Sequence, residues 1–405
     1  MLPDQIILYS KASLIKVNEI FDLVKSVLLL DSRNLAQLFM GCVLILTIAG
    51  FCVYKKLGST SIIIPDQCGT ALNTHWPYLA LIAVSCVISS LIYPFFWENG
   101  YIDPFYYLAY SLHFPEYYKE IFPGTYYGAR FGAIMPGYLV YKIFPPVVAN
   151  LALIWFKSFL GAFSLYAFLV RSRGHLAATL TAIVFTLWPW VERTMASLYV
   201  DGYGVAYYLL TAALIMQARH SAAPKKWLFA GGVSVGLVFS TYTFCVLHCI
   251  PLIVFYMFDG RQKTSRHYVH DFAFLTSWMG FGFIMLLCAF GLLSRAFGES
   301  FFYYTPSFWI ILKLLASNPW TPTEYSWLRT AYWMDIQFIA IITAVIGLMV
   351  YLIHRRHSKK NWEFSHTVSL VCIMTFLLHY LLGDKGMSLQ YSYYTSYLFG
   401  ISFLT

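Results

Sequence analysis

Charged side chains are scarce in this sequence. Only 11% of its 405 residues are Asp, Glu, Lys or Arg, whereas 59% are hydrophobic. A soluble globular domain carries about 25% charged and about 45–50% apolar residues, so this chain has too few polar side chains to cover a surface in contact with water. The composition excludes an ordinary soluble fold and predicts an all-α polytopic membrane protein whose solvent is lipid.

Motifs for several familiar chemistries are also missing. The sequence has no GxxxxGK[ST] phosphate loop, no HExxH zinc motif and no GxSxG motif at a strand-to-helix turn. The loops predicted on the cytoplasmic side are too short to form a nucleotide-binding domain. An enzyme built on this chain must therefore take its activated substrate from the membrane.

Disulfide and export signals are missing as well. Seven of the eight cysteines lie in apolar segments, and the eighth, Cys68, lies in a loop. Cys245 and Cys249 flank His248 but have no second pair of ligands, so we interpret them as small buried hydrophobes rather than a metal site. The N-terminus carries charges throughout and lacks the apolar core of a cleavable signal peptide.

Apolar segments long enough to cross a bilayer recur along the chain. Since a crossing needs about 20 apolar residues, we predict about eleven spans. They lie near residues 36–54, 78–96, 149–170, 176–191, 203–218, 227–243, 245–258, 272–292, 336–353, 366–382 and 391–405. One bent helix over 227–258 is the alternative to the sixth and seventh. Residues 1–35 are predicted to form an amphipathic interfacial segment and residues 36–405 a single transmembrane domain. Because the chain ends in an apolar run, a longer natural protein is also an open alternative.

Basic residues mark one side of the predicted bundle. The loops after the first, third, fifth, seventh and ninth spans are short and contain Lys55, Lys56, Arg171, Arg173, Arg219, Lys225, Lys226, Arg261, Lys263, Arg266, Arg355, Arg356, Lys359 and Lys360. The positive-inside rule puts these loops in the cytoplasm and explains the net charge of +9 without nucleic acid. A single span over 227–258 would put the Arg261 loop on the opposite side of the membrane from the other basic loops, which favours two spans there. Because the loop after the first span is cytoplasmic, the N-terminus is predicted outside, although residues 11–33 carry four basic residues.

The opposite side holds two long segments, 97–148 and 293–335. Both mix aromatic residues with prolines, a texture typical of short amphipathic helices that lie in the membrane interface. This side also holds ten acidic residues, Glu98, Asp103, Glu116, Glu120, Glu192, Asp201, Glu299, Glu324, Asp335 and Asp384. The polar chemistry is therefore predicted at the external face.

Asp103 and Arg130 are the leading candidates for a site. Asp103 follows the second span, where apolar surroundings suit a carboxylate to general-base catalysis. The alternative is an N-cap for a helix that begins at Pro104. The planar fork of Arg130, in TYYGARFG, suits a lipid-linked phosphate, and the alternative is an interfacial arginine that snorkels to water.

Three more ionisable residues belong to the predicted site. Lys157 is predicted roughly 12 Å below the external end of its span. Ionisable groups at such depth mark functional paths, with snorkelling as the alternative. Arg193 and Asp201 lie between the fourth and fifth spans, in WPWVERTMASLYVDGYG.

The motifs resemble those of the GT-C glycosyltransferases, polytopic enzymes that use polyprenyl-phosphate sugars and include the protein O-mannosyltransferases and the lipid A aminoarabinose transferases. The closer resemblance is to bacterial family 39-type members. It rests on Asp103–Tyr107, Phe122–Arg130, Pro136–Leu139, Tyr199–Gly202 and Gln390–Leu398. The acidic loop follows the second apolar segment here rather than the first, and Glu98 stands five residues before Asp103 in place of an adjacent acidic pair.

The resemblance implies a GT-C-like bundle that transfers a sugar from a polyprenyl-phosphate donor to a glycan, lipid or protein acceptor at the periplasmic or outer face of a bacterial plasma membrane. Asp103 is the expected catalytic base, and Arg130, Arg193 and Lys157 are expected to bind the donor phosphate. The expected substrate-binding residues are Glu98, Tyr107, Tyr127, Asp201, Gln390 and Tyr394. No metal or other cofactor is required, although Glu98 and Asp103 could share a divalent ion.

Two other classes remain open. A transporter or flippase for a lipid-linked or anionic substrate would show related halves and polar groups at the midplane, and the sequence shows neither. A membrane scaffold would use the external aromatic residues for assembly. This class does not explain why Asp103, Arg130 and Asp201 are all predicted on the same side of the membrane.

Overall fold

Helices make up all the regular elements that the computed structural model of the protein describes. The described residues are 75–92, 103–241, 243, 246, 249–257 and 265–309, all within one compact unit of the chain. The helices are α3 (Trp76–Ile92), α4 (Asp103–Leu112), α5 (Phe114–Glu116), the π-helix η2 (Tyr117–Ile121), α6 (Phe131–Ile143), α7 (Pro146–Leu187), α8 (Pro189–Ala196), α9 (Asp201–His220), α10 (Pro224–Thr241), α11 (Ile250–Met257) and α12 (Ser265–Ala296). Helical structure is thus confirmed in the apolar segments between residues 78 and 292 that fall in these ranges. The predicted spans at 36–54, 336–353, 366–382 and 391–405 lie outside the described residues.

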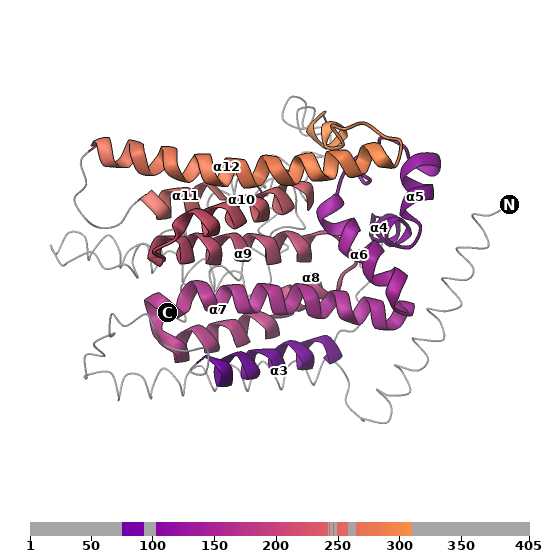
Figure 1. The fold of residues 1–405 in the computed structure, drawn as a ribbon. Helices are drawn as coiled ribbons and strands as arrows, with labels where there is room; N and C mark the ends of the chain where they lie inside the picture. The colour runs from indigo at the N-terminus through magenta and orange to yellow at the C-terminus, as the bar shows by residue number, and fades with distance from the viewer. Residues whose placement is uncertain are drawn as a thin grey trace, which may run out of the picture. The chain divides into compact units, whose positions relative to one another are not determined.

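The long helices run side by side, and α4, α5 and α6 gather at one end of them (Figure 1). Helix α9 packs against α7 and α10, α10 packs against α12, and α3 packs against α7. Polar pairs fix α3 in place, because Thr186 donates to Ser85 over 2.8 Å and Trp155 donates to Ser90 over 2.8 Å.

Helix α7 consists of two antiparallel arms that meet at Gly174. This glycine has φ 76° and ψ 172°, a backbone conformation with positive φ that residues other than glycine rarely adopt. On one straight helix residues 161 and 185 would lie roughly 36 Å apart, yet a methyl group placed on Gly161 would be 3.3 Å from the Phe185 ring. The sequence prediction of separate segments 149–170 and 176–191 is therefore confirmed as two helices.

Among the described residues, those of the predicted cytoplasmic loops share one end of the bundle. Arg171, beside the Gly174 turn, donates a hydrogen bond of 2.9 Å to Gln217 near the end of α9. Tyr256, near the end of α11, lies within electrostatic range of Arg219 on α9. Helix α10 starts at this end and α11 returns to it, which agrees with two segments rather than one bent helix over 227–258.

In the part of the chain that the structure describes, two helices are long and apolar enough to cross a membrane by length and composition, Pro146–Leu187 and Val269–Ala296. The second is mostly exposed, with Phe281, Ile284 and Leu292 among its exposed side chains. Exposed apolar side chains along a whole helix suit a lipid environment better than water, so the two helices weakly indicate membrane association. The number of crossings stays a prediction.

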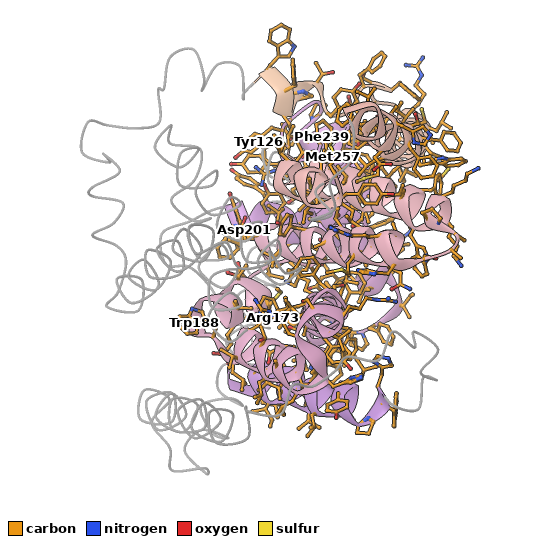
Figure 2. All side chains as sticks on the ribbon, turned by 90° about the vertical axis from the view of Figure 1, so that its left-hand side faces the viewer. Tyr126, Arg173, Trp188, Asp201, Phe239 and Met257 are labelled. Atoms are coloured by element: carbon orange, nitrogen blue, oxygen red, sulfur yellow. The ribbon has the colours of Figure 1, made fainter. Side chains whose placement is uncertain are left out.

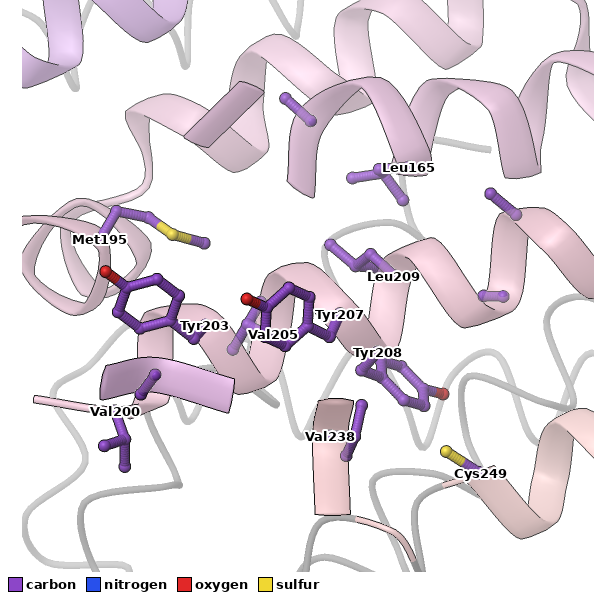
Figure 3. Packing of buried hydrophobic residues seen from close by; sticks show 14 of the residues in the cluster. Leu165, Met195, Val200, Tyr203, Val205, Tyr207, Tyr208, Leu209, Val238 and Cys249 are labelled. Atoms are coloured by element: carbon purple, nitrogen blue, oxygen red, sulfur yellow. The ribbon is translucent and has the colours of Figure 1, made fainter. Parts of the chain in front are cut away.

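The core centres on α9, whose first nine residues are all buried. Figure 3 shows Leu209 of α9 facing Leu165 of α7, and Tyr208 directed toward Cys249. The Tyr207 hydroxyl donates to the carbonyl of Gly132 over 2.9 Å, and Ser234 of α10 donates to the carbonyl of Tyr207 over 2.9 Å. These bonds satisfy polar groups that would be costly to bury alone.

Helices α10 and α12 cross with their backbones in contact. A Cβ atom on Gly282 of α12 would overlap the carbonyl of Phe229, and one on Gly232 of α10 would overlap the carbonyl of Met279. Small residues allow such close approach between apolar helices, where dispersion contacts replace the hydrophobic effect. Gly280, two residues from Gly282, has open space where its Cβ would be.

We expect Gly282→Ala to destabilise the protein and Gly280→Ala to leave it unchanged or slightly more stable. The first substitution overpacks the crossing, which costs about 1–3 kcal/mol. The second adds helix propensity of about 0.5–1 kcal/mol without a clash. Thermal unfolding of the two purified variants in one detergent measures the difference. Equal midpoints would show that the helices do not cross at Gly282.

Candidate functional site

Segment 122–130 folds into the turn that carries Arg130. Gly124 has φ 61°, which lets the chain reverse directly after Pro123. The Tyr110 hydroxyl of α4 donates to the carbonyl of Phe122 over 3.1 Å and lies 2.9 Å from Thr125 Oγ1. Burial raises the pKa of Tyr110 to about 12, so this hydroxyl stays a donor at every physiological pH. The FPGTYYGAR motif is thus held against α4.

Arg130 lies in a box of three tyrosine rings. Its guanidinium carbon is 5.3 Å from the ring centre of Tyr107, 5.0 Å from Tyr126 and 5.9 Å from Tyr199. Only 7% of the residue is exposed. Cation–π attraction is worth about 2 kcal/mol or more when the pair is desolvated, so the box stabilises a positive charge that has little contact with water. This arrangement is not that of an arginine that snorkels to the surface.

More aromatic rings extend the box outward. Tyr127 is 4.9 Å from Tyr106 and 5.7 Å from Tyr107 between ring centres, and Tyr106 meets Phe122 at 5.2 Å. Tyr106 and Tyr127 are half-buried. In Figure 2, which looks along the helices, Tyr126 and Asp201 lie along the same edge of the bundle.

Lys157 and Asp201 form a second polar group beside the box. Lys157, on the first arm of α7, is 2% exposed, and its Nζ donates to the carbonyl of Ser197 over 2.8 Å. The Asp201 carboxylate, 9% exposed at the start of α9, acts electrostatically on this ammonium group. The Lys157 Nζ also lies 5.0 Å above the ring of Tyr203. Lys157 is therefore anchored inside the protein.

A small cavity joins the two groups. It has a volume of about 20 Å³ and is lined on its polar side by Tyr107, Ser111, Tyr141, Lys157 and Tyr203. Tyr107 belongs to both groups, because it borders the cavity and contacts the Arg130 guanidinium. One water molecule occupies roughly this space, so the cavity does not admit a sugar.

Parts of the two predicted external segments meet at this end of the bundle. Tyr118 of η2 lies 2.7 Å from Ser294 through their hydroxyl groups, and Ser240 lies 2.6 Å from Tyr303. Phe131, directly after Arg130, packs against Tyr303 with ring centres 4.7 Å apart. Residues 294–304 thus cover the helices that follow the turn.

Five of the residues predicted from the sequence come together here, namely Tyr107, Tyr127, Arg130, Lys157 and Asp201. Asp103 is the first residue of α4, one helical turn before Tyr107, but its side chain lies outside the described part of the structure, as does that of Arg193. Glu98, Gln390 and Tyr394 lie outside the described residues. The base and the N-cap roles of Asp103 both stay predictions.

Sequence reasoning missed Tyr126, Tyr199 and Ser197. The first two stand in motifs quoted above for the resemblance, next to residues that were singled out, so the local density of tyrosine beside Arg130 was the available signal. Ser197 contributes a main-chain carbonyl, and the pattern of side chains in a sequence does not predict which main-chain groups form such contacts.

A search of protein-family models finds no match to this chain, and a search of curated proteins finds no significant one. Within the described ranges, no group of three His, Cys, Asp or Glu side chains converges to hold a metal ion.

Proposed function

We propose that the protein is a polytopic membrane glycosyltransferase, which transfers a sugar from a polyprenyl-phosphate donor to an acceptor at the external face of a bacterial plasma membrane. The resemblance of its motifs to GT-C enzymes supports this function. So does the Arg130 box, which is the observation that carries the proposal. Its position supports the external face, because it lies at the end of α9 opposite the basic loops.

The box suits a phosphate group for a geometric reason. The N–H donors of a guanidinium lie in its plane and match two phosphate oxygens at once. Tyrosine ring faces stabilise the charge without using these donors. A cation held away from water also attracts phosphate more strongly than one in bulk solvent, because the effective dielectric constant is lower.

Asp103 is the proposed base. The acceptor hydroxyl attacks the anomeric carbon and passes its proton to the carboxylate, while the bond between that carbon and the phosphate oxygen breaks. Polyprenyl phosphate leaves with the bonding electrons, and Arg130 stabilises the charge that develops on it. A phosphate leaving group needs little protonation, so one base and one cation suffice. Direct attack inverts the anomeric configuration.

Purified protein in lipid nanodiscs, supplied with radiolabelled polyprenyl-phosphate sugars and an envelope extract as acceptor, tests this function. We expect label to move to the acceptor with release of one polyprenyl phosphate per sugar transferred. Native mass spectrometry should also show a retained polyprenyl-phosphate sugar. Movement of intact donor between leaflets, without cleavage of the sugar–phosphate bond, would instead identify a flippase.

A further inference from the structure

Lys157 occupies a place that does not suit the binding of a donor phosphate. Its ammonium group already donates to the Ser197 carbonyl, is balanced electrostatically by Asp201 and lies above the Tyr203 ring. The cavity it borders has space for about one water molecule, with a volume of about 20 Å³. A phosphate that carries both a sugar and a lipid is several times larger. The phosphate-binding role expected from the sequence is therefore not the one that this geometry favours.

Two of the groups that Lys157 engages, the Ser197 carbonyl and the Asp201 carboxylate, belong to residues 197–202, the connection between α8 and α9 together with the first two residues of α9. Ser197 opens this connection, and its side chain also accepts a hydrogen bond of 3.0 Å from the amide of Tyr199. Gly202 ends it, and a Cβ atom there would lie 3.0 Å from Lys157 Cδ and 2.7 Å from the carbonyl of Thr194. The side chain of Lys157 thus passes through a gap that only glycine leaves open.

Tyr199 lies in the middle of the same connection. Its ring is 5.9 Å from the Arg130 guanidinium and 5.5 Å from the ring of Tyr107. The residue is 8% exposed, so it is one of the walls that separate Arg130 from water. The position of this wall depends on what holds residues 197–202 against α7.

We propose that Lys157 is a positioning residue, which fixes the 197–202 connection and so keeps the Tyr199 wall closed over Arg130. A buried ammonium group that bridges a main-chain carbonyl and a carboxylate defines one arrangement of the connection, because each partner is costly to leave without the other. The geometric claim stands without any substrate. Its consequence for donor binding rests on the proposed function.

Chemical modification of Arg130 by phenylglyoxal, followed by peptide mass spectrometry, tests the geometric claim without a substrate. In the wild-type protein Arg130 should react slowly, because it is buried. In Lys157→Met, which keeps the length of the side chain but removes the charge, we expect Arg130 to react at least 10-fold faster. The exposed Arg295 on α12 normalises the reaction between samples.

Three further variants make the result specific. Tyr199→Ala should expose Arg130 with Lys157 intact. Lys142→Met should change nothing, because Lys142 is an exposed lysine on α6 that contacts only the ring of its neighbour Tyr138 among the described residues. The double variant Lys157→Met with Asp201→Asn removes both charges, and it replaces the single variant if that does not fold. Unchanged reactivity of Arg130 in the Lys157 variants, or in Tyr199→Ala, would overturn the proposal.

The same variants separate this inference from the proposed function. If the chain transfers sugar, Lys157→Met should raise the KM for the donor more than it lowers kcat, and Lys157→Arg should restore part of the loss. If the chain does not transfer sugar, the change in Arg130 reactivity remains, and only the proposed function fails.

Discussion

Replacing Arg130 with methionine is expected to reduce the rate of sugar transfer by about 10²–10³-fold, the usual effect of removing one group that stabilises developing charge in an enzyme site. Methionine keeps much of the volume of the side chain and its contacts with the rings of Tyr107, Tyr126 and Tyr199, so the box should stay packed. The loss then reports the missing cation. Transfer assays at saturating acceptor, with donor concentration varied, give kcat and KM separately.

Two control variants sharpen this result. Arg130→Lys keeps the charge but loses the planar fork, so we expect an intermediate rate and a higher KM for the donor. Arg295→Met removes an exposed arginine from α12 and should leave transfer unchanged. An Arg130→Met variant that folds, and that binds and transfers donor at the wild-type rate, would exclude the phosphate role.

The fold was predictable where the signal is local. Apolar runs predicted α3, the two arms of α7, α9, α10, α11 and α12, and the basic loop at Arg171 and Arg173 predicted the reversal that the structure places at Gly174. The meeting of α10 and α12 at Gly232 and Gly282 was not predictable. Both glycines lie inside apolar runs, and a close approach depends on which helices become neighbours.

The site was predictable in part, for the same reason. Arg130 stands out in the sequence because a charged residue in an aromatic, apolar stretch needs partners that offset the cost of removing its charge from water. The sequence does not show which residues these partners are, since two of the three tyrosine rings come from α4 and from the connection before α9. Lys157 shows the reverse. Its depth identified it as important, but its partner is a main-chain carbonyl forty residues away, which only tertiary structure supplies.

Asp103→Asn is expected to lower the rate of sugar transfer by about 10²–10⁴-fold, the contribution of a positioned general base. The substitution separates the two roles that the sequence leaves open. Asparagine caps a helix N-terminus about as well as aspartate does, so a residue that only caps α4 tolerates it. An amide does not accept a proton from the acceptor hydroxyl, so a base does not tolerate it.

Asp103→Ala and Glu116→Gln complete the design. Alanine removes both the base and the cap, and a lost cap lowers stability by about 1 kcal/mol. If Asp103 is the base, Asn and Ala should lose transfer equally, whereas thermal unfolding should distinguish them if it is also a cap. Glu116 is an exposed acidic residue on the neighbouring α5, and its amide variant should keep full activity. Wild-type transfer by a folded Asp103→Asn variant would assign Asp103 to the cap and leave the proposed reaction without its base.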